Sequence, residues 1–474
     1  MDTRSEGLRD PLAAAVIAAC IGLAPGQASA RPPRVAGDTI VVQNCNDGGA
    51  GSLRDAIADV ADGGTIDLTA LACSVITLNS ELVVQQDDLA LQGPGSAGLT
   101  IDAATHDRVL LHEGGGTLAV DDLTIANGTY RGGSYHGTRG GCVLSDGGSI
   151  ALHDAVITNC TLTSEFDTTT SIRGGGCVFA GQNVTLTGSR VDGCIATVTA
   201  DDELDGGGVS AIAVAMVGSV VTGVRAKSGI TLGVGVNAPG GFTMKYSTLA
   251  DNVDTGDAAL DYRSQGGGVQ ANAPIYLLGS TISNNHAYSG GGALFFGDAI
   301  DIRNSTIADN TAFHRGGLTI LTSATATVQN TTIAFNTSNA SEASGLGLYD
   351  AAVELQSTII AKNISGAAER DLSGQGTSSV SGSHNLIPAS TLATPPDTLT
   401  DDPRLRALHA NGGPTETVAL YPDSAAIDRG DNPLGLAHDQ RGSAFAREAG
   451  GGVDIGAYEL QEDADAIFWD GFDA

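Results

Sequence analysis

Two dense groups of acidic residues are the side chains of this sequence best suited to holding a metal ion. Each group comes shortly before a run of three glycines, so we expect both to lie in loops between strands. Carboxylate oxygens are ligands that Ca²⁺ prefers, and a bound Ca²⁺ can bridge to an acidic sugar. Neither spacing matches an EF-hand or a nonapeptide calcium repeat, so we interpret both groups as solvated loops of an acidic protein, with calcium binding as the alternative. The candidate calcium ligands are Asp201, Asp202, Glu203, Asp205, Asp251, Asp254, Asp257 and Asp261.

A lyase that acts on an acidic polysaccharide also needs a base, which is often arginine or lysine. The candidate cations are scattered along the chain without a repeated alignment, and no continuous motif typical of pectate lyases, polygalacturonases or pectin esterases occurs. We therefore predict no catalytic residue and no cofactor-binding residue, with calcium as the one candidate ion. The cations considered are Arg225, Lys227, Lys245, Arg263, Arg303 and Arg315.

The densest polar group outside these loops lies near the C-terminus. The stretch His438–Arg441 combines a histidine, a carboxylate, an amide and a guanidinium, with Asp428 and Asp454 nearby in the sequence. Such a group can serve catalysis or can hold irregular backbone together through buried hydrogen bonds. We interpret it as a buried network that stabilises an irregular segment.

The composition limits the partners that the protein can bind. The chain has 474 residues, of which 54 are acidic and 23 basic, giving a formal charge of −31 with only three lysines. No basic patch for phosphate binding can be assembled from this set, which excludes nucleic acid and argues against metal-free binding of acidic polysaccharides. A hydrophobic fraction of 41% supplies enough aliphatic side chain for a core and excludes a disordered acidic chain.

The first thirty residues have the features of a secretory signal peptide. Leu12–Ala24 is apolar but too short to span a bilayer, and Ala28–Ala30 forms a small-residue cleavage site. We expect the mature chain to begin at Arg31 and to lie outside the cell or on its outer surface. The alternative is a lipobox at Ile17–Cys20, with lipid attached to its cysteine. No other segment is long and apolar enough to span a membrane.

A ten-residue phrase recurs through the middle of the chain, and a glycine run precedes most of its copies. Copies that end on asparagine are separated by 33, 25, 26 and 27 residues. Apolar residues alternate with small polar ones inside each copy, which is the period of a strand. Their final residues are Asn252, Asn285, Asn310, Asn336 and Asn363.

Repeats of this kind predict an all-β fold, a right-handed parallel β-helix. One coil cannot bury its own apolar face, whereas stacked coils at ~4.8 Å pair every strand with its copies above and below. Identical positions then form ladders. We expect the five asparagines to hydrogen-bond along the axis at a turn that tolerates left-handed backbone. A parallel hydroxyl ladder is expected at Ser247, Ser280, Ser305, Thr331 and Thr358.

Six of the seven cysteines follow the predicted cleavage site, and an even number in an oxidising compartment predicts three disulfides. Two of them follow a glycine run, and two hold the ladder position where later repeats have asparagine. Stacked positions lie about one strand spacing apart, within the ~4.4–6.8 Å Cα separation of a disulfide. The predicted disulfides are therefore Cys45–Cys73, Cys142–Cys177 and Cys160–Cys194. The alternative is pairing within each coil, as Cys142–Cys160 and Cys177–Cys194.

Both ends of a solenoid must be covered. Ser52 followed by Asp55 is an N-cap pattern, which predicts a short helix over the first coil. Beyond residue 384 the repeat stops and prolines become frequent, which predicts an irregular C-terminal cap. The predicted organisation is a signal peptide at 1–30, an N-terminal cap with the first coils at 31–115, β-helix repeats at 116–384, a C-terminal cap at 385–460 and an acidic tail at 461–474.

Stretches at both ends resemble families of secreted bacterial proteins. Asn44–Asp47 followed by Gly51–Ile57 is similar to the N-terminal motif of β-helix proteins of the polymorphic-outer-membrane-protein-like type. The C-terminal region resembles a choice-of-anchor domain of the Q type. Its matching stretches are Asp402–Leu405, Asn411–Thr415, Ala425–Asp428, Asp439–Gly442 and Asp454–Glu459. The resemblance implies a secreted or surface-attached β-helix with no settled activity.

The sequence therefore predicts an exported, non-catalytic β-helix protein with a structural, adhesive or glycan-binding role. Its expected partners are cell-surface or extracellular glycans or proteins. Because β-helices also carry polysaccharide lyases, a lyase-like enzyme that depends on calcium is the alternative. A carboxylate pair and an arginine that converge on one face would favour the enzyme.

Overall fold

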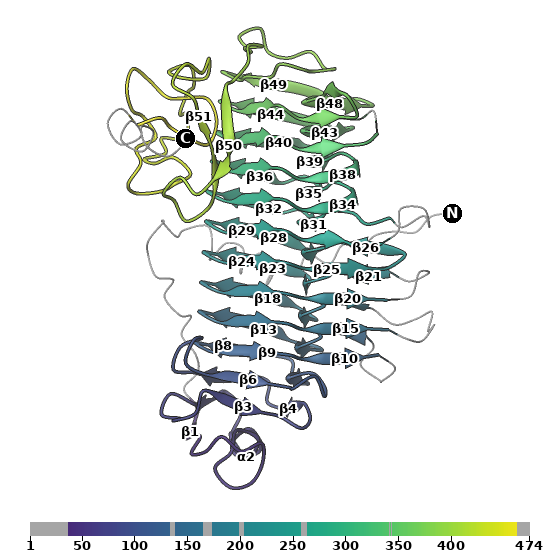
Figure 1. Ribbon diagram of the computed structural model, residues 1–474, viewed down its shortest axis with the longest axis vertical. Helices are drawn as coiled ribbons and strands as arrows, with labels where there is room; N and C mark the ends of the chain where they lie inside the picture. Colours follow the sequence, from purple (N-terminus) through teal and green to yellow (C-terminus); the bar gives the residue numbers. More distant parts are fainter. Residues whose placement is uncertain are drawn as a thin grey trace, which may run out of the picture.

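The computed structural model describes residues 37–132, 138–164, 173–198, 203–256, 263–340, 342 and 344–461. They form a parallel β-helix of about eleven coils stacked along one long axis (Figure 1). The predicted all-β solenoid is confirmed. The predicted signal peptide and all but the first residue of the predicted acidic tail lie outside the described residues. Within these residues, no helix has the length and apolar character needed to cross a membrane.

Each complete coil passes in order through four faces, which we call sheets A, B, D and C. Sheet A has thirteen parallel strands: β1 (Thr39–Val41), β2 (Gly64–Asp67), β5 (Leu89–Gln92), β8 (Thr117–Asp121), β13 (Ser149–His153), β18 (Asn183–Thr187), β23 (Ala213–Val217), β28 (Gly241–Lys245), β32 (Ile275–Leu278), β36 (Ile300–Arg303), β40 (Thr325–Gln329), β44 (Ala352–Gln356) and β49 (Ser379–Ser383).

Sheets B and C have eleven parallel strands each. Sheet B contains β3 (Val75–Thr77), β6 (Thr100–Asp102), β9 (Thr124–Ala126), β14 (Val156–Thr158), β19 (Arg190–Asp192), β24 (Val220–Thr222), β29 (Thr248–Ala250), β33 (Thr281–Ser283), β37 (Thr306–Ala308), β41 (Thr332–Ala334) and β45 (Ile359–Ala361). Sheet C contains β4 (Leu82–Val84), β7 (Leu110–His112), β12 (Val143–Ser145), β17 (Val178–Ala180), β22 (Val209–Ser210), β27 (Val236–Ala238), β31 (Val269–Asn272), β35 (Ala293–Phe296), β39 (Leu318–Leu321), β43 (Leu346–Tyr349) and β48 (Leu372–Gln375).

From β10 onward, each coil passes through sheet D between sheets B and C. In four coils, a strand of a shorter sheet follows the strand of sheet D. Sheet D contains β10 (Thr129–Arg131), β15 (Thr161–Thr163), β20 (Ile195–Thr197), β25 (Arg225–Lys227), β30 (Val253–Asp254), β34 (His286–Ser289), β38 (Thr311–His314), β42 (Thr337–Ser338), β46 (Ile364–Ser365) and β47 (Ala368–Glu369). The four-stranded sheet contains β11 (Thr138–Arg139), β16 (Arg173–Gly174), β21 (Glu203–Asp205) and β26 (Ile230–Leu232).

The apolar core runs along the inside of the coils because the strands pair in register. In sheet B the central residue of each strand points inward and is fully buried, so that branched aliphatic side chains stack in one continuous column. This column consists of Ile76, Ile101, Ile125, Ile157, Val191, Val221, Leu249, Ile282, Ile307, Ile333 and Ile360.

A short helix, α2 (Leu53–Asp59), covers the N-terminal end of the core, as predicted. The Ser52 side chain accepts a hydrogen bond from the Asp55 backbone N–H at 3.2 Å, and the Asp55 carboxylate accepts one from the Gly51 N–H at 3.1 Å. This reciprocal capping satisfies amides that the first turn leaves without intrahelical partners. Leu53 and Ile57 face the core and are buried.

The predicted asparagine ladder is confirmed. Each side-chain amide donates to the Oδ1 of the next ladder asparagine at 2.9–3.0 Å, and the ladder ends on the carboxylate of Asp371. The expected left-handed backbone lies one residue earlier than the ladder itself. The residues with φ between 53° and 62° are Asp251, Asn284, Asp309, Phe335 and Lys362.

The hydroxyl ladder is present among its serines. The Ser247 N–H donates to the side-chain oxygen of Ser280 at 3.3 Å, and the Ser280 N–H donates to that of Ser305 at 3.2 Å. The predicted continuation through Thr331 and Thr358 differs, because the Thr358 N–H donates to Asn385 at 3.0 Å. The hydroxyls in turn donate to the carbonyl two residues earlier, as Ser247 does to Lys245. Every buried hydroxyl in this part of the ladder is thereby satisfied.

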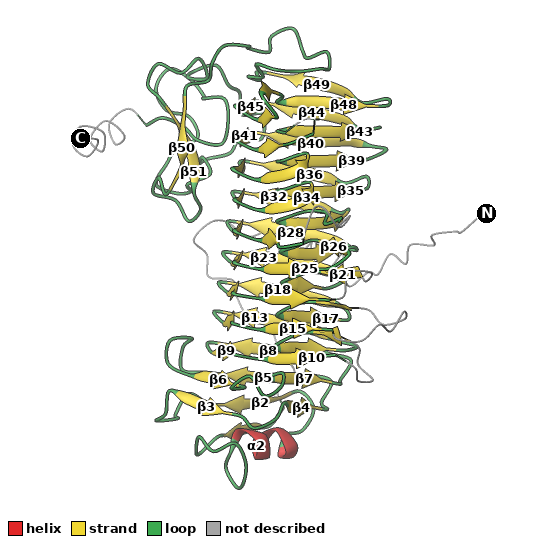
Figure 2. Cartoon of the chain, turned by 45° about the vertical axis from the view of Figure 1, so that its right-hand side comes forward, coloured by secondary structure: helices red, strands yellow, loops and turns green. Residues whose placement is uncertain are grey.

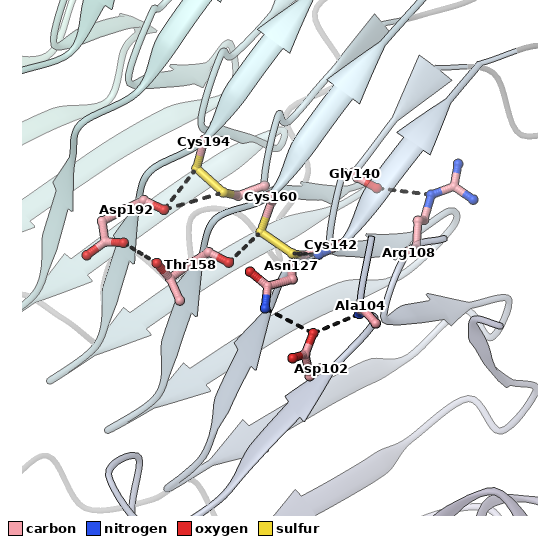
Figure 3. The surroundings of a disulfide bond; sticks show 12 residues. Asp102, Ala104, Arg108, Asn127, Gly140, Cys142, Thr158, Cys160, Asp192 and Cys194 are labelled. Carbon is pink, nitrogen blue, oxygen red and sulfur yellow. Dashed lines mark hydrogen bonds between the residues drawn. A yellow bond between two sulfur atoms is a disulfide. The ribbon is translucent and has the colours of Figure 1, made fainter. Parts of the chain in front are cut away.

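The disulfides differ from the preferred prediction. Cys45–Cys73 is present, but the other two bonds join cysteines of the same coil, Cys142–Cys160 and Cys177–Cys194, with Cα separations of 5.4 and 5.5 Å (Figure 3). The predicted Cys142–Cys177 and Cys160–Cys194 pairs do stack on adjacent coils. Stacked side chains, however, point inward side by side, whereas a disulfide requires Cβ atoms that point toward each other.

The C-terminal part of the chain covers one flank of the solenoid as well as its end (Figure 2). Leu386 bridges to Ile359 and to Leu399, which places 385–399 over the last coil. Residues 400–461, which we call the C-terminal segment, lie beside the upper coils in both views. This segment contains one antiparallel pair, β50 (Leu405–His409) and β51 (Thr417–Leu420).

Candidate functional site

A groove of about 310 Å³ lies on the outer face of sheet D. Strands β34, β38 and β42 form its floor, and the turn after β30 forms one end. Residues alternate between outside and inside along these strands, so Ala287 and Ala312 are buried while their neighbours face the groove. The outward side chains are His286, Tyr288, Thr311, Phe313, Thr337 and Asn339.

Two aromatic rings stand side by side on consecutive coils of this groove. Tyr288 and Phe313 are stacked with ring centroids 5.3 Å apart and an interplanar angle of 11°. His314 packs its ring edge-on to both, at 5.2 Å from Tyr288 and 4.8 Å from Phe313. Phe313 is nevertheless 43% exposed. An exposed aromatic stack with polar neighbours is the kind of surface that receives an amphipathic ligand.

Polar groups around the rings can bond to hydroxyl-rich ligands. Asp254 is mostly buried, and one of its carboxylate oxygens accepts a hydrogen bond from the Gly256 N–H at 2.8 Å. His286, Thr311 and Thr337 are exposed on adjacent coils in register. Donors and acceptors thus recur along the solenoid axis at the ~4.8 Å spacing of the strands.

A compact polar cluster adjoins the groove through His314. The Arg315 guanidinium donates to Glu342 at 2.7 Å and lies 4.1 Å from the Tyr349 ring centroid. The Tyr349 hydroxyl donates to the same carboxylate at 3.1 Å. Burial is the main reason that the pKa of Tyr349 is raised to about 12. The tyrosine therefore stays protonated at neutral pH and keeps its hydrogen bond to Glu342.

The groove residues were not predicted from the sequence, although one signal was present. Tyr288 and Phe313 each lie three residues after a ladder asparagine, Asn285 and Asn310. In a chain with 4% aromatic residues, two aromatic side chains at the same repeat position mark one face of adjacent coils. The ladder register therefore places the rings together.

The structure places the described calcium candidates on two different elements. Glu203 and Asp205 lie on β21, where burial and the neighbouring Glu203 raise the pKa of Asp205 to about 6. Asp251 is exposed at the turn before the ladder, and Asp254 borders the groove. Among described residues, no group of three or more histidine, cysteine or acidic side chains is arranged to hold a metal. Four candidates, Asp201, Asp202, Asp257 and Asp261, lie outside them.

The six candidate cations do not converge on one site. Arg225 and Lys227 are exposed on β25, whereas Lys245 is buried on β28. Arg303 pairs with Asp301 at 2.6 Å on sheet A. The two remaining cations are Arg263, which is exposed, and Arg315, which pairs with Glu342 at 2.7 Å.

The polar group near the C-terminus forms a buried network in the C-terminal segment. Asp439 accepts two hydrogen bonds from Arg441, at 2.9 and 2.8 Å, and the guanidinium lies between the rings of Phe445 and Tyr458, 3.8 Å from each centroid. The neighbouring Arg447 lies 3.5 Å from Glu459. All four side chains of these two ion pairs are fully buried, which fits the predicted structural role.

Gln440 joins this network to the solenoid. Its amide donates to Thr281 at 2.9 Å and to Thr415 at 3.0 Å, and its carbonyl accepts from Thr306 at 2.6 Å. Thr281 and Thr306 are outward residues of sheet B. The stretch Asp439–Gly442, which carries the choice-of-anchor resemblance, therefore both stabilises the C-terminal segment and docks it on the flank.

Comparisons with protein-family models, with curated proteins and with solved structures return no match for this chain. The two family resemblances at the ends of the chain remain predictions, and the functional argument rests on the groove.

Proposed function

We propose that the protein is an exported β-helix protein that binds glycans through the groove on sheet D. The observation that carries the proposal is the stacked Tyr288–Phe313 pair, which stays exposed beside a line of hydroxyl and carboxylate groups. Sugar rings have apolar C–H faces and polar rims. Aromatic side chains match the first of these features and regularly spaced polar groups match the second.

The arrangement of coils supports an extended ligand. Outward positions of sheet D repeat at each coil, so a polymer with a short repeat can make the same contact several times. The three disulfides support the exported location, because such bonds persist in oxidising compartments.

The described residues support binding better than catalysis. A glycosidase needs two carboxyl groups within ~5–9.5 Å of each other. Asp254 on β30 and Glu342 after β42 are separated by three coils, or roughly 14 Å along the axis. Glu342 also accepts hydrogen bonds from Arg315 and Tyr349. With a pKa of about 12, Tyr349 stays protonated at neutral pH and cannot act as a base.

The test is a binding panel of neutral and acidic oligosaccharides titrated with the mature chain, in calcium and again in chelator. We expect at least one oligosaccharide to bind and Phe313→Ala to weaken it about tenfold or more, since central aromatic contacts dominate such interfaces. Val75→Ala is the matched control, because Val75 is 43% exposed, like Phe313, but lies on sheet B, away from the groove and from sheet D.

Absence of binding across the panel, or equal affinity of Phe313→Ala and the wild type, would overturn the proposal. Ultraviolet absorbance of unsaturated sugar ends, followed in the same samples, tests the lyase alternative. We expect a flat trace.

A further inference from the structure

The outer face of sheet D continues beyond the groove toward the N-terminal coils. Strand register aligns Arg225 with Val253 and Val253 with His286, so β25 lies two coils below β34. This separation is ~10 Å along the axis. Arg225 and Lys227 are both exposed there, and Ala226 between them is fully buried. The two cationic side chains therefore project from the same face as the groove.

These two cations differ from the paired arginines Arg190 of sheet B and Arg303 of sheet A. Arg190 pairs with Asp192 at 2.6 Å, and Arg303 pairs with Asp301. Neither Arg225 nor Lys227 has an ion pair or side-chain hydrogen bond with any residue that the structure describes. The outward neighbours of Arg225 on the adjacent coils are Ile195 and Val253, neither of which has a charge.

Two like charges at adjacent outward positions repel each other and attract an anion. We propose that the glycan of the groove is an acidic polysaccharide that lies along the solenoid axis, with its anionic groups on Arg225 and Lys227 and its sugar rings against Tyr288 and Phe313. This inference rests on the proposed function and specifies the chemical class of its ligand.

The strongly negative total charge of the chain argues against an acidic ligand. The charges close to the ligand nevertheless decide its binding, because distant charges are screened. At physiological salt, exposed charges more than about 8–10 Å apart are largely screened. Two described carboxylates lie on elements that neighbour β25: Asp254, which is mostly buried and bonded to the Gly256 N–H, and Glu203, which lies on the four-stranded sheet. Glu342, beyond the other end of the groove, is paired with Arg315. Asp254 is in register with the buried Ala226, so it does not stack on the outward positions of Arg225 and Lys227.

The experiment compares an oligogalacturonate hexamer with its fully methyl-esterified form, which removes the charge and keeps the sugar rings. Binding is measured by calorimetry at low and at high salt for the wild type, for the double variant Arg225→Gln/Lys227→Gln and for Arg190→Gln. Arg190 is the matched control because it is an exposed cation on sheet B.

We expect the wild type to bind the acid about tenfold more tightly than the ester at low salt and to lose this preference at high salt. The double variant should bind both forms as the wild type binds the ester, while Arg190→Gln should keep the preference. An ester that binds the wild type as tightly as the acid would overturn this inference and leave the proposed function standing. If neither form binds and no neutral oligosaccharide of the panel binds, both the proposed function and this inference are overturned.

Discussion

Two outer faces of the same coils differ in whether another part of the chain covers them. Under the C-terminal segment, every residue of β33, β37 and β41 in sheet B is buried. On sheet D, the next strands of the same coils keep exposed residues, including His286, Thr311 and Phe313. The coil backbone is alike on both faces, so the difference comes from the outward side chains and from what covers them.

On the covered face, the outward side chains are small, and their threonine hydroxyls bond to the C-terminal segment. Thr281 and Thr306 bond to Gln440, and Thr332 accepts from the Ala457 N–H at 3.0 Å. On the open face the outward positions carry aromatic rings that no described part of the chain covers. We infer that sheet B, which the C-terminal segment covers, contributes to stability, whereas the exposed rings of sheet D form the proposed ligand site.

The largest loss of stability is expected when the C-terminal segment, which covers sheet B, is destabilised. Arg441→Ala removes the two guanidinium donors from Oδ2 of the buried Asp439, at a cost of about 3–5 kcal/mol in the free energy of unfolding of the C-terminal segment. We expect residues 400–461 to become sensitive to protease while oligosaccharide binding in the groove persists. Arg404→Ala is the control, since its pair with Asp423 is exposed and worth at most ~1 kcal/mol. Loss of groove binding in Arg441→Ala would contradict the independence of the two faces.

Removing a ladder rung should weaken both faces at once. Asn310→Ala leaves the backbone and side-chain amides of Asn285 without their acceptor, which we expect to cost roughly 2–4 kcal/mol. Hydrogen exchange should then speed up in sheets B and D of the neighbouring coils. Asn339→Ala, which removes an exposed amide from the groove, is the control and should leave exchange unchanged. Faster exchange in one sheet only would show that the ladder does not hold the faces together.

The two faces should also differ in their response to pH. Burial is the first cause, and the nearby Asp454 the second, of the raised pKa of Glu459, which reaches about 8. Because the folded pKa lies above the ordinary value of 4.5, the stabilising contribution is complete below pH 4.5 and is lost as the pH rises through about 8. We expect the C-terminal segment to lose roughly 4 kcal/mol over this range, since each pKa unit corresponds to ~1.4 kcal/mol.

Thermal unfolding followed from pH 4.5 to pH 8 measures this loss, and Glu459→Gln should flatten the profile. A profile of the same slope in Glu459→Gln would assign the pH dependence to other groups.

The smallest effect on stability is expected at the open face. Phe313→Ala should change the free energy of unfolding by less than about 1 kcal/mol, because the ring is 43% exposed and contributes little to the core. Phe295→Ala is the matched comparison, since Phe295 is fully buried and its truncation should cost about 3–5 kcal/mol. Chemical denaturation of the two variants measures the difference. A similar loss in both would make Phe313 a structural residue and remove the basis of the ligand site.

The sequence predicted the features that recur at each coil. Ladder residues such as Asn285 and Asn310 repeat with the coil period, and period alone sets their stacking. The capping helix was also predictable, because Ser52 and Asp55 act within one turn.

Features that depend on how a coil closes or on contacts between distant segments were not predicted correctly. Pairing of Cys142 with Cys160 depends on the width of the coil, which repeat spacing does not give. The bond from Gln440 to Thr281 joins residues 159 positions apart and has no repeated pattern behind it. The groove needs both the register of sheet D and the absence of a cover, of which only the register could be deduced.

The most direct test of the ligand site is the position of an oligosaccharide in a crystal of the mature protein soaked with a ligand from the binding panel. The account predicts density along the outer face of sheet D, in contact with Tyr288 and Phe313 and bordered by Asp254. Density confined to the open part of sheet B, on β14, β19 and β24, would contradict it.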